Sequence, residues 1–331
     1  AAGGSLAGLG YGQLQIYNSN QGNLSPREVW TGQGERKFFG VSIANLGDED
    51  GDGWPSLAVG APLEGATQGG CVFVGEADGV NKTASGLPAM CGPDYASAGS
   101  VLAAVGDVDG DGLEDLLVGS NPDYRYATRP QVVWLITAPI AGNLADVAAA
   151  SWDWESTSEG EGSVVAGAGD VDADGHMDLL VGAPADRAVG YGVGAAFLIV
   201  GNPSGAGSLA SADAKILGSG TTFMWLGTSV AAAPDIDGDS LTDLAVGANN
   251  ADDNGASSGT VFLLSGTVRG TVPARGTAHT WLMGEAGDAA GHGVGQADDQ
   301  DGDGLSELWV SSTTYGLGSG AVWGLSLAGP P

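Results

Sequence analysis

Acidic residues recur in this chain at a spacing that suits the binding of a hard cation. A segment with the consensus Asp-x-Asp-x-Asp-Gly-x-x-Asp-Leu occurs five times in the 331 residues, and its copies start at positions 48, 107, 170, 235 and 299. Carboxylates that lie a few ångströms apart repel one another, so a cluster of this kind needs a counter-ion. Calcium accepts about six to eight oxygen ligands in a tolerant geometry. The five segments therefore predict about five calcium sites.

Within each acidic loop, the predicted ligands are the side chains at positions 1, 3, 5 and 9 and the backbone carbonyl at position 7, counted from the first Asp. They are Asp48, Asp50, Asp52 and Trp54; Asp107, Asp109, Asp111, Leu113 and Asp115; Asp170, Asp172, Asp174, His176 and Asp178; Asp235, Asp237, Asp239, Leu241 and Asp243; and Asp299, Asp301, Asp303, Leu305 and Glu307. The first loop has Ser56 in place of the acid at position 9, and the fourth has Ser240 in place of the Gly at position 6. The loops that begin at 107 and 170 therefore fit the consensus best.

The residues around the loops distinguish between kinds of calcium loop. An EF-hand loop carries a Glu at position 12 and lies between two helices, and a dockerin loop also needs an acid there. Position 12 is valine in all five copies, within short apolar runs such as 57–62 and 179–184. Such runs, closed by Gly or Pro, predict buried strands. Small and β-branched residues precede each loop, so each loop is expected to join the two strands of a hairpin.

Two short motifs flank these hairpins. Phe39-Gly40 precedes the first loop and Gly60-Ala61-Pro62 follows it, Gly182-Ala183-Pro184 repeats the second motif, and Gly247-Ala248-Asn249 nearly does. Together they resemble the FG-GAP repeat of the integrin α-chain N-terminal propeller. The resemblance implies an all-β fold, a β-propeller with four-stranded antiparallel blades, and calcium in the loop between strands 1 and 2 of a blade.

The resemblance covers essentially the whole chain and predicts one β-propeller domain, 1–331. The expected repeats are 1–39 (partial), 40–98, 99–161, 162–226, 227–290 and 291–331 (partial). Third strands are expected at 12–17, 71–75, 132–137, 195–201, 260–266 and 321–327, and fourth strands at 27–32, 214–219 and 279–285. Six third strands against five loops leave the blade count open between five and seven. Trp134, Trp309 and Trp323 fall within expected strands and are predicted to pack in the core.

Composition narrows the function further. The formal net charge is −30 with only 10 basic residues, which disfavours nucleic acid as a partner because phosphates need Lys and Arg patches. The sequence contains no run of 18 apolar residues, so membrane insertion is not predicted. Cys71 and Cys91 are the two cysteines, and they form either a disulfide or two free buried thiols. Calcium loops and a disulfide favour a secreted or cell-surface protein.

A candidate ligand face follows from the expected topology. The connections between strands 2 and 3, and between strands 4 and 1, lie opposite the calcium loops. They carry Tyr124, Arg125, Tyr126, Arg187, Tyr191 and Tyr315. Exposed Tyr and Arg are typical of recognition surfaces, although such residues also pack loops without binding anything. The resemblance favours binding, because integrin-like propellers engage ligands on this face.

These observations predict a calcium-binding extracellular module for adhesion or protein interaction, with structural calcium. The alternative is a calcium-stabilised lectin that binds glycans between blades. The ligand is accordingly a protein or a glycan, and the oligomeric state stays open. No catalytic cluster emerges from the sequence: His176 lies in the third loop, and His279 and His292 lie in different strands. Gly255–Gly259 matches Gly-x-Ser-x-Gly but precedes a strand, whereas a nucleophile elbow must link a strand to a helix. An enzyme is not expected.

Overall fold

The computed structural model describes residues 2–4, 12–17, 26–34, 37–120, 131–137, 144–154, 164–220, 223–297, 299, 302, 306–314 and 319–326. The chain forms two compact units. The first comprises Ala1–Asp107, Asp111–Asp153 and Ser204–Gly207, and the second comprises Val108–Gly110, Trp154–Pro203 and Ser208–Pro331. In the described part, no helix is long and apolar enough to cross a membrane.

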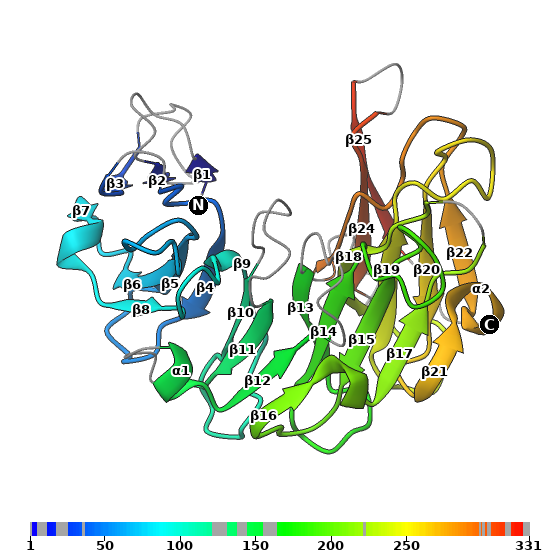
Figure 1. Ribbon diagram of the computed structural model, residues 1–331, viewed down its shortest axis with the longest axis horizontal. Helices are drawn as coiled ribbons and strands as arrows, with labels where there is room; N and C mark the ends of the chain where they lie inside the picture. Colours follow the sequence, from blue (N-terminus) through cyan, green and yellow to red (C-terminus); the bar gives the residue numbers. More distant parts are fainter. Residues whose placement is uncertain are drawn as a thin grey trace. The chain divides into compact units, whose positions relative to one another are not determined.

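Three sheets make up the first unit (Figure 1). The first has the order β1-β2-β3-β7, with β1 (Ala2–Gly4), β2 (Gln13–Ile16), β3 (Glu28–Thr31) and β7 (Lys82–Thr83). The second has the order β4-β5-β6-β8, with β4 (Ile43–Gly47), β5 (Ser56–Ala61), β6 (Cys71–Glu76) and β8 (Ala89–Cys91). The third has the order β16-β12-β11-β10-β9, with β9 (Ala98–Ala104), β10 (Leu116–Ser120), β11 (Val132–Ile136), β12 (Ala150–Asp153) and β16 (Gly205–Ser208). Two short helices, η1 (Ala84–Gly86) and α1 (Leu144–Val147), lie between strands.

Three further sheets make up the second unit. One has the order β13-β14-β15-β17-β21, with β13 (Val164–Gly169), β14 (Asp178–Ala183), β15 (Ala195–Ile199), β17 (Ala214–Leu217) and β21 (Gly270–Pro273). The next has the order β18-β19-β20-β22, with β18 (Leu226–Ala233), β19 (Asp243–Ala248), β20 (Thr260–Leu264) and β22 (Thr280–Met283). The last has the order β23-β24-β25, with β23 (Gly293–Ala297), β24 (Glu307–Ser312) and β25 (Ala321–Ser326). The short helices are η2 (Leu209–Ser211) and α2 (Ala274–Thr277).

Each acidic loop lies at the turn of an antiparallel hairpin, as the sequence predicts. In the hairpin of β13 and β14, for example, Val165 pairs with Val181 and Gly169 pairs with Asp178 on either side of the loop. Every residue of β14 and of β19 is buried. A strand that is covered on both faces needs an apolar run rather than an alternating pattern, which explains why these segments read LLVGA and LAVGA.

The expected third strands form β2, β6, β11, β15, β20 and β25, and the three expected fourth strands form β3, β17 and β22. Trp134 is buried in β11, as predicted. The prediction for Trp309 is wrong, because its side chain in β24 is 40% exposed. In the part that the structure describes, the sheet of β24 has three strands.

The two cysteines form a disulfide, which decides between the alternatives that the sequence left open. Cys71 of β6 and Cys91 of β8 are bonded and are also register partners in the sheet. The disulfide therefore fastens the third strand of this blade to the fourth.

Paired glycines make the contact between successive sheets within each unit. A Cβ atom at Gly182 of β14 would come within 2.2 Å of the carbonyl oxygen of Gly227 in β18, and one at Gly247 of β19 within 2.3 Å of that of Gly291. Gly60 and Gly99 repeat this contact at 2.0 Å in the first unit. Real Cβ atoms do not approach so closely, so these positions require glycine. The glycine after the loop of one sheet thus packs directly against the backbone of the glycine before the loop of the next sheet.

Short parallel strands extend two of the sheets, and the sequence does not predict them. β7 pairs in parallel with β3 in the first unit, and β21 pairs in parallel with β17 in the second. In both cases the added strand comes from the connection that follows the third strand of the next sheet along the chain. Successive sheets are therefore joined by hydrogen bonds as well as by packing.

Candidate metal centres

The aspartate at position 1 organises each of the four acidic loops that the structure describes in full. Its Oδ2 accepts a hydrogen bond from the backbone N–H of position 6 at 2.8–3.1 Å, in Asp48, Asp107, Asp170 and Asp235. The aspartate at position 5 then accepts one from the N–H of position 7 at 2.8–2.9 Å, in Asp52, Asp111, Asp174 and Asp239. These bonds curl the backbone around the carboxylates.

Two residues per loop adopt a left-handed backbone conformation. Position 6 has φ between 69° and 92° in these four loops, and position 4 has φ between 60° and 86°. Glycine fills most of these positions, but Ser240 occupies position 6 of the fourth loop with φ 69° and Ala173 occupies position 4 of the third with φ 60°. The glycine at position 6 marks one of these turns in the sequence, whereas the left-handed residue at position 4 was not predicted.

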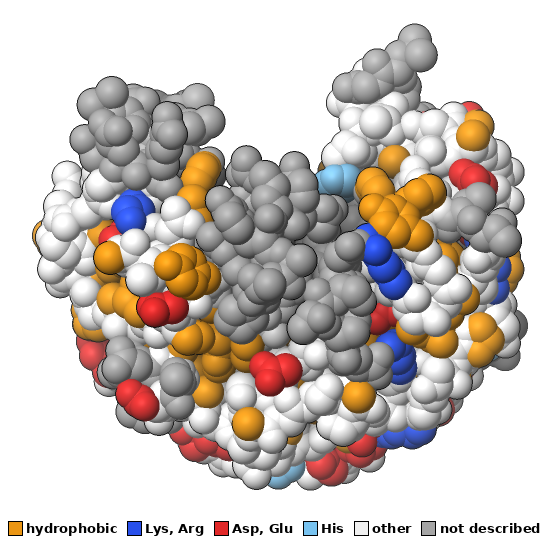
Figure 2. All heavy atoms as spheres, in the orientation of Figure 1, with side chains coloured by type: hydrophobic (Ala, Val, Ile, Leu, Met, Phe, Trp, Pro, Cys, Tyr) orange, Lys and Arg blue, Asp and Glu red, His pale blue; other side chains and the backbone are white. Residues whose placement is uncertain are grey.

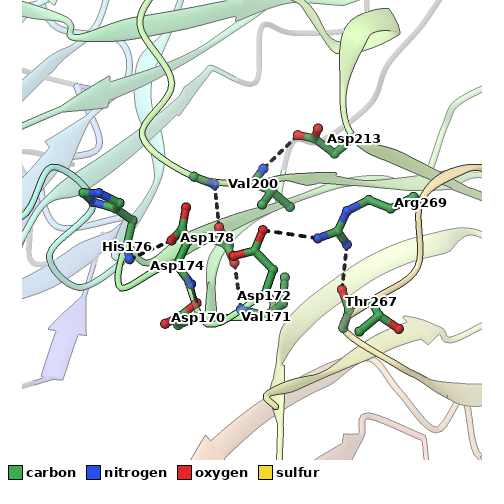
Figure 3. A network of polar contacts seen from close by, with 12 residues as sticks. Asp170, Val171, Asp172, Asp174, His176, Asp178, Val200, Asp213, Thr267 and Arg269 are labelled. Atoms are coloured by element: carbon green, nitrogen blue, oxygen red, sulfur yellow. Dashed lines mark hydrogen bonds and ion pairs between the residues drawn. The ribbon is translucent and has the colours of Figure 1, made fainter. Parts of the chain in front are cut away.

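The acid at position 9 is buried, unlike the acids at the turn. Asp115, Asp178 and Asp243 have no exposed surface. Asp178 accepts hydrogen bonds from the backbone N–H of Val171 at 2.7 Å and of Gly201 at 2.6 Å (Figure 3). Asp243 is held in the same way by Ile236 at 2.7 Å and Gly266 at 2.9 Å. The side chain at position 9 therefore connects the loop to the end of the third strand.

Burial also changes the acidity of these two groups. Loss of hydration raises the pKa of Asp178 and that of Asp243 from 3.8 to about 6, against the opposing effect of the two backbone N–H donors. Neighbouring aspartates of the same loop, Asp172 and Asp174 for the first and Asp237 and Asp239 for the second, raise each pKa further. A cation beside either group would reverse the effect of these like charges.

Carboxylate oxygens converge in all four loops. In each, three acids place an oxygen within 4.8 Å of one another: Asp48, Asp50 and Asp52; Asp107, Asp109 and Asp115; Asp170, Asp172 and Asp178; Asp235, Asp237 and Asp239. The other predicted side-chain ligands of these loops, Asp111, Asp174 and Asp243, lie outside the groups. A set of three hard oxygen donors fits calcium and suits softer metals poorly.

The fifth loop is only partly visible. Asp301, Asp303 and Leu305 lie outside the described residues, and Asp299 and Glu307 lie within them. Glu307 is 5% exposed. Its burial matches that of Asp115, Asp178 and Asp243 at the same position.

Two side chains near the third loop were not foreseen as contacts. His176, at position 7, directs its ring Nδ1 at the carbonyl oxygen of Val108, 2.8 Å away. Arg269 pairs with Asp172 at 3.6 Å, across from the turn (Figure 3). Both partners of that ion pair are at least one third exposed, so it contributes little to stability.

Of the residues predicted for the ligand face, Arg187 and Tyr191 are described, whereas Tyr124, Arg125, Tyr126 and Tyr315 lie outside the described residues. The guanidinium carbon of Arg187 lies 4.0 Å from the centre of the Tyr191 ring. Tyr191 in turn meets the ring of Phe223 edge-on, with 5.1 Å between the ring centres. The structure thus brings the predicted pair together with an aromatic residue that the sequence analysis missed.

Tyr191, Phe223 and Trp225 form what we call the aromatic patch. Their exposed fractions are 62%, 47% and 44%. A Cβ atom at Gly192 would lie 2.5 Å from the Phe223 ring and 3.0 Å from the Trp225 indole nitrogen, so both of these rings pack against the glycine next to Tyr191. Figure 2 shows hydrophobic side chains beside Lys and Arg side chains on one part of the molecular surface.

The family model of the FG-GAP repeat matches the chain in three places, at residues 98–136, 162–199 and 226–264. Each match runs from the first strand of a hairpin, through its acidic loop, to the end of the third strand. The chain is an FG-GAP repeat β-propeller. Its predicted division into one domain with six repeats stays a prediction.

This FG-GAP propeller is similar to integrin α-chains. Integrin alpha-V of Gallus gallus is 31% identical over 190 residues, which cover 54% of this chain and 18% of the relative. Integrin alpha pat-2 of Caenorhabditis elegans is 30% identical over 263 residues, which cover 73% of this chain and 20% of the relative. The chain therefore spans about a fifth of the length of these relatives.

A weaker likeness links the FG-GAP propeller to a solved enzyme structure. The α-L-arabinofuranosidase from Lactobacillus brevis has a TM-score of 0.43 and 11% sequence identity, over 86% of this chain and 90% of that chain. A likeness at this level carries no argument about activity. The expectation that the FG-GAP propeller is not an enzyme stays a prediction.

Proposed function

We propose that the chain is a calcium-stabilised extracellular propeller that binds a protein partner through the aromatic patch. The observation that carries the proposal is the patch itself. Its three large rings are each more than 40% exposed, and they come from two connections whose Tyr191 and Phe223 rings are in contact. Exposed aromatic clusters of this kind are characteristic of protein interaction surfaces.

The patch lies at the strand ends opposite the acidic loops. β14 begins next to the third loop and ends at Ala183, so the connection that carries Arg187 and Tyr191 starts at the far end of the strand. β17 runs antiparallel to β15, so the connection that carries Phe223 and Trp225 also lies at that end. This arrangement supports the predicted separation of a metal-binding end from a recognition end.

The backbone around the patch is fixed before any partner binds. Trp225 has a φ of 54°, a conformation that is costly for a bulky residue. Its backbone N–H donates to Gly192 at 3.0 Å, and its carbonyl oxygen accepts from the Thr228 hydroxyl at 2.6 Å. Preorganised rings lose little conformational entropy on binding.

Charge complementarity indicates what the partner presents. The chain has a formal net charge of −30, and five bound calcium ions would leave it at about −20. A strongly negative protein attracts positively charged partners over a distance. We therefore expect a protein that offers an apolar or cationic anchor to the rings within a basic surface.

The proposed role of calcium is to hold the hairpin turns. When bound, it would neutralise the three converging carboxylates of each loop. The residues that would hold it are the predicted ligands of each acidic loop, with the groups led by Asp107 and Asp170 as the best candidates, because each includes the buried acid at position 9. The disulfide and the calcium loops both support an extracellular setting.

Binding of the chain to a panel of immobilised extracellular proteins, in millimolar calcium, tests the proposal. The double variant Tyr191→Ser/Trp225→Ser is expected to weaken the binding of any partner by at least about tenfold. Val80→Ser is the matched control, because Val80 is 60% exposed and lies in the first unit. Equal binding by the double variant and the wild type would contradict a role for the patch. A parallel glycan array in calcium and in chelator tests the lectin alternative, which would be favoured by calcium-dependent binding to one sugar class.

A further inference from the structure

In the third acidic loop, the residue at position 2 packs against the next sheet. Val171, at position 2 of the third loop, is fully buried. A Cβ atom at Gly266, after β20 in the next sheet, would come within 2.8 Å of the Val171 Cβ. The N–H of Gly266 donates to Asp243, the buried acid of the fourth loop. Position 2 of one loop is therefore a neighbour of the position-9 acid of the following loop.

Position 2 carries a buried apolar side chain in three loops. Val108 and Val171 are fully buried, and Ile236 is 7% exposed. The first loop differs, because its position 2 is Glu49. A carboxylate at a place where these three loops bury an aliphatic side chain needs a specific partner.

Among the described residues, one oxygen of Glu49 has no such partner. Its Oε1 has almost no exposed surface and makes no hydrogen bond there, although the side chain as a whole is only partly buried. The charges that act on Glu49 are like charges, from Asp111, Asp50 and Asp115. Two of these three aspartates belong to the second loop rather than to Glu49's own loop. An enclosed oxygen beside two further carboxylates is the environment of a cation ligand.

We propose that Glu49 is a ligand shared between loops: it belongs to the first loop and contributes an oxygen to the calcium ion of the second, held by Asp107, Asp109 and Asp115. The inference rests on the proposed calcium binding. Because Glu49 lies between Asp48 and Asp50, filling the second site fixes the backbone that carries the ligands of the first. The two sites therefore fill cooperatively.

This arrangement also accounts for a defect of the first loop. Ser56 stands where the other loops have an acid at position 9. In the third and fourth loops this acid, Asp178 or Asp243, accepts a hydrogen bond from the backbone just after the third strand. The first loop lacks such a side chain. Glu49 supplies a different anchor, through the ion of the neighbouring loop. The weakest site by ligand count is thereby supported by one of the strongest.

Terbium binding to the full chain tests the coupling, because Trp54 at position 7 of the first loop is placed to sensitise terbium bound there. The signal that Trp54→Phe removes reports the filling of the first site. Asp109→Asn, which disables the second site, is expected to raise the terbium concentration needed at the first site by about tenfold or more. In the Glu49→Gln background, Asp109→Asn is expected to have no such effect.

Calcium titration by calorimetry supplies the second readout, with Glu76→Gln as the matched control. The Glu76→Gln variant loses the same charge beside Asp52 and Asp50 of the first loop, but from a partly exposed position, so it should change calcium affinity at most about fivefold. Glu49→Gln is expected to weaken the second site by about tenfold or more. Glu49→Val, which copies Val108 and Val171, should fold and should melt at a higher temperature than the wild type in chelator.

The outcomes separate this inference from the proposed function. If the wild type binds neither calcium nor terbium, the calcium proposal itself fails. If the wild type binds calcium but Glu49→Gln matches Glu76→Gln, only the sharing of Glu49 is overturned. An effect of Asp109→Asn that is equally large with and without Glu49 would also overturn it, since the coupling would then run by another route.

Discussion

Ser240 shows how a single backbone angle affects an acidic loop. Its φ of 69° lies in the left-handed region that glycine occupies at the same position in the first three loops. A residue with a side chain costs about 1 kcal/mol or more of stability in this conformation. Ser240→Gly is therefore expected to raise the free energy of unfolding by about 1 kcal/mol, measured by urea denaturation. Gly112→Ser is the reciprocal control: a Cβ there meets nothing within 4 Å, so its loss of stability would report conformation alone. A Ser240→Gly variant no more stable than the wild type would contradict this account.

The buried acids at position 9 predict opposite pH dependences with and without calcium. The pKa of Asp243 is about 6 in the folded chain, against 3.8 for the ordinary group. A group with a raised pKa contributes stability that is complete below 3.8 and is lost as the pH rises through about 6. In chelator, the wild type should therefore lose stability over this interval relative to Asp243→Asn, which cannot ionise.

In calcium, the direction reverses. Protons compete with the cation for the same oxygens, so the calcium-loaded protein should become less stable as the pH falls from 7 toward 5. Urea denaturation across this pH range, in calcium and in chelator, gives both curves. Curves with the same slope in both solutions would show that Asp178 and Asp243 do not titrate as their burial implies.

At the scale of the strand, the contact between paired glycines sets how closely successive sheets stack. Gly247→Ala in β19 would place a Cβ 2.2 Å from the Ser229 hydroxyl and 2.3 Å from the Gly291 carbonyl oxygen. We expect a loss of about 1–3 kcal/mol in the free energy of unfolding from this overpacking. Gly295→Ala in β23 is the control, because a Cβ there meets nothing within 4 Å. Similar losses in both variants would mean that strand entropy, rather than the contact, decides the effect.

The strands themselves were largely predictable from sequence, for a physical reason. Second and third strands such as β14 and β15 are buried on both faces, and continuous apolar runs mark them. β7 and β21 carry no such signal, because their sequences KT and GTVP contain no long apolar run and bury little. The exposure of Trp309 was not predictable from its own strand, since it depends on what covers the sheet.

The candidate metal centres were predictable because each is encoded within ten consecutive residues. The aromatic patch was not, because it joins two connections that lie about 30 residues apart. One signal was available. Phe223 and Trp225 shortly precede Gly227, the glycine that begins the fourth hairpin. Glu49 was likewise overlooked, because position 2 is not a ligand of its own loop.

For the whole molecule, net charge links metal binding to salt. Without calcium, a formal charge of −30 destabilises the compact state by self-repulsion, and salt screens that repulsion over a distance of about 10 Å at 0.1 M. Added sodium chloride should therefore raise the melting temperature in chelator more than in calcium. Chelation should also lower the melting temperature substantially at low salt. Equal salt effects in the two solutions, on protein shown to bind calcium, would contradict this link.

The parallel pairing of β17 with β21 has a mechanical consequence. In a parallel pair, the amino end of one strand and the carboxyl end of the other lie at opposite ends of the ribbon, so tension along the chain acts in shear. The four register pairs from Ala214–Gly270 to Leu217–Pro273 then share the load at once. An antiparallel hairpin such as β14 and β15, pulled from one end, instead opens one bond at a time. A molecule stretched between two anchored surfaces would thus yield at its hairpins before this strand pair.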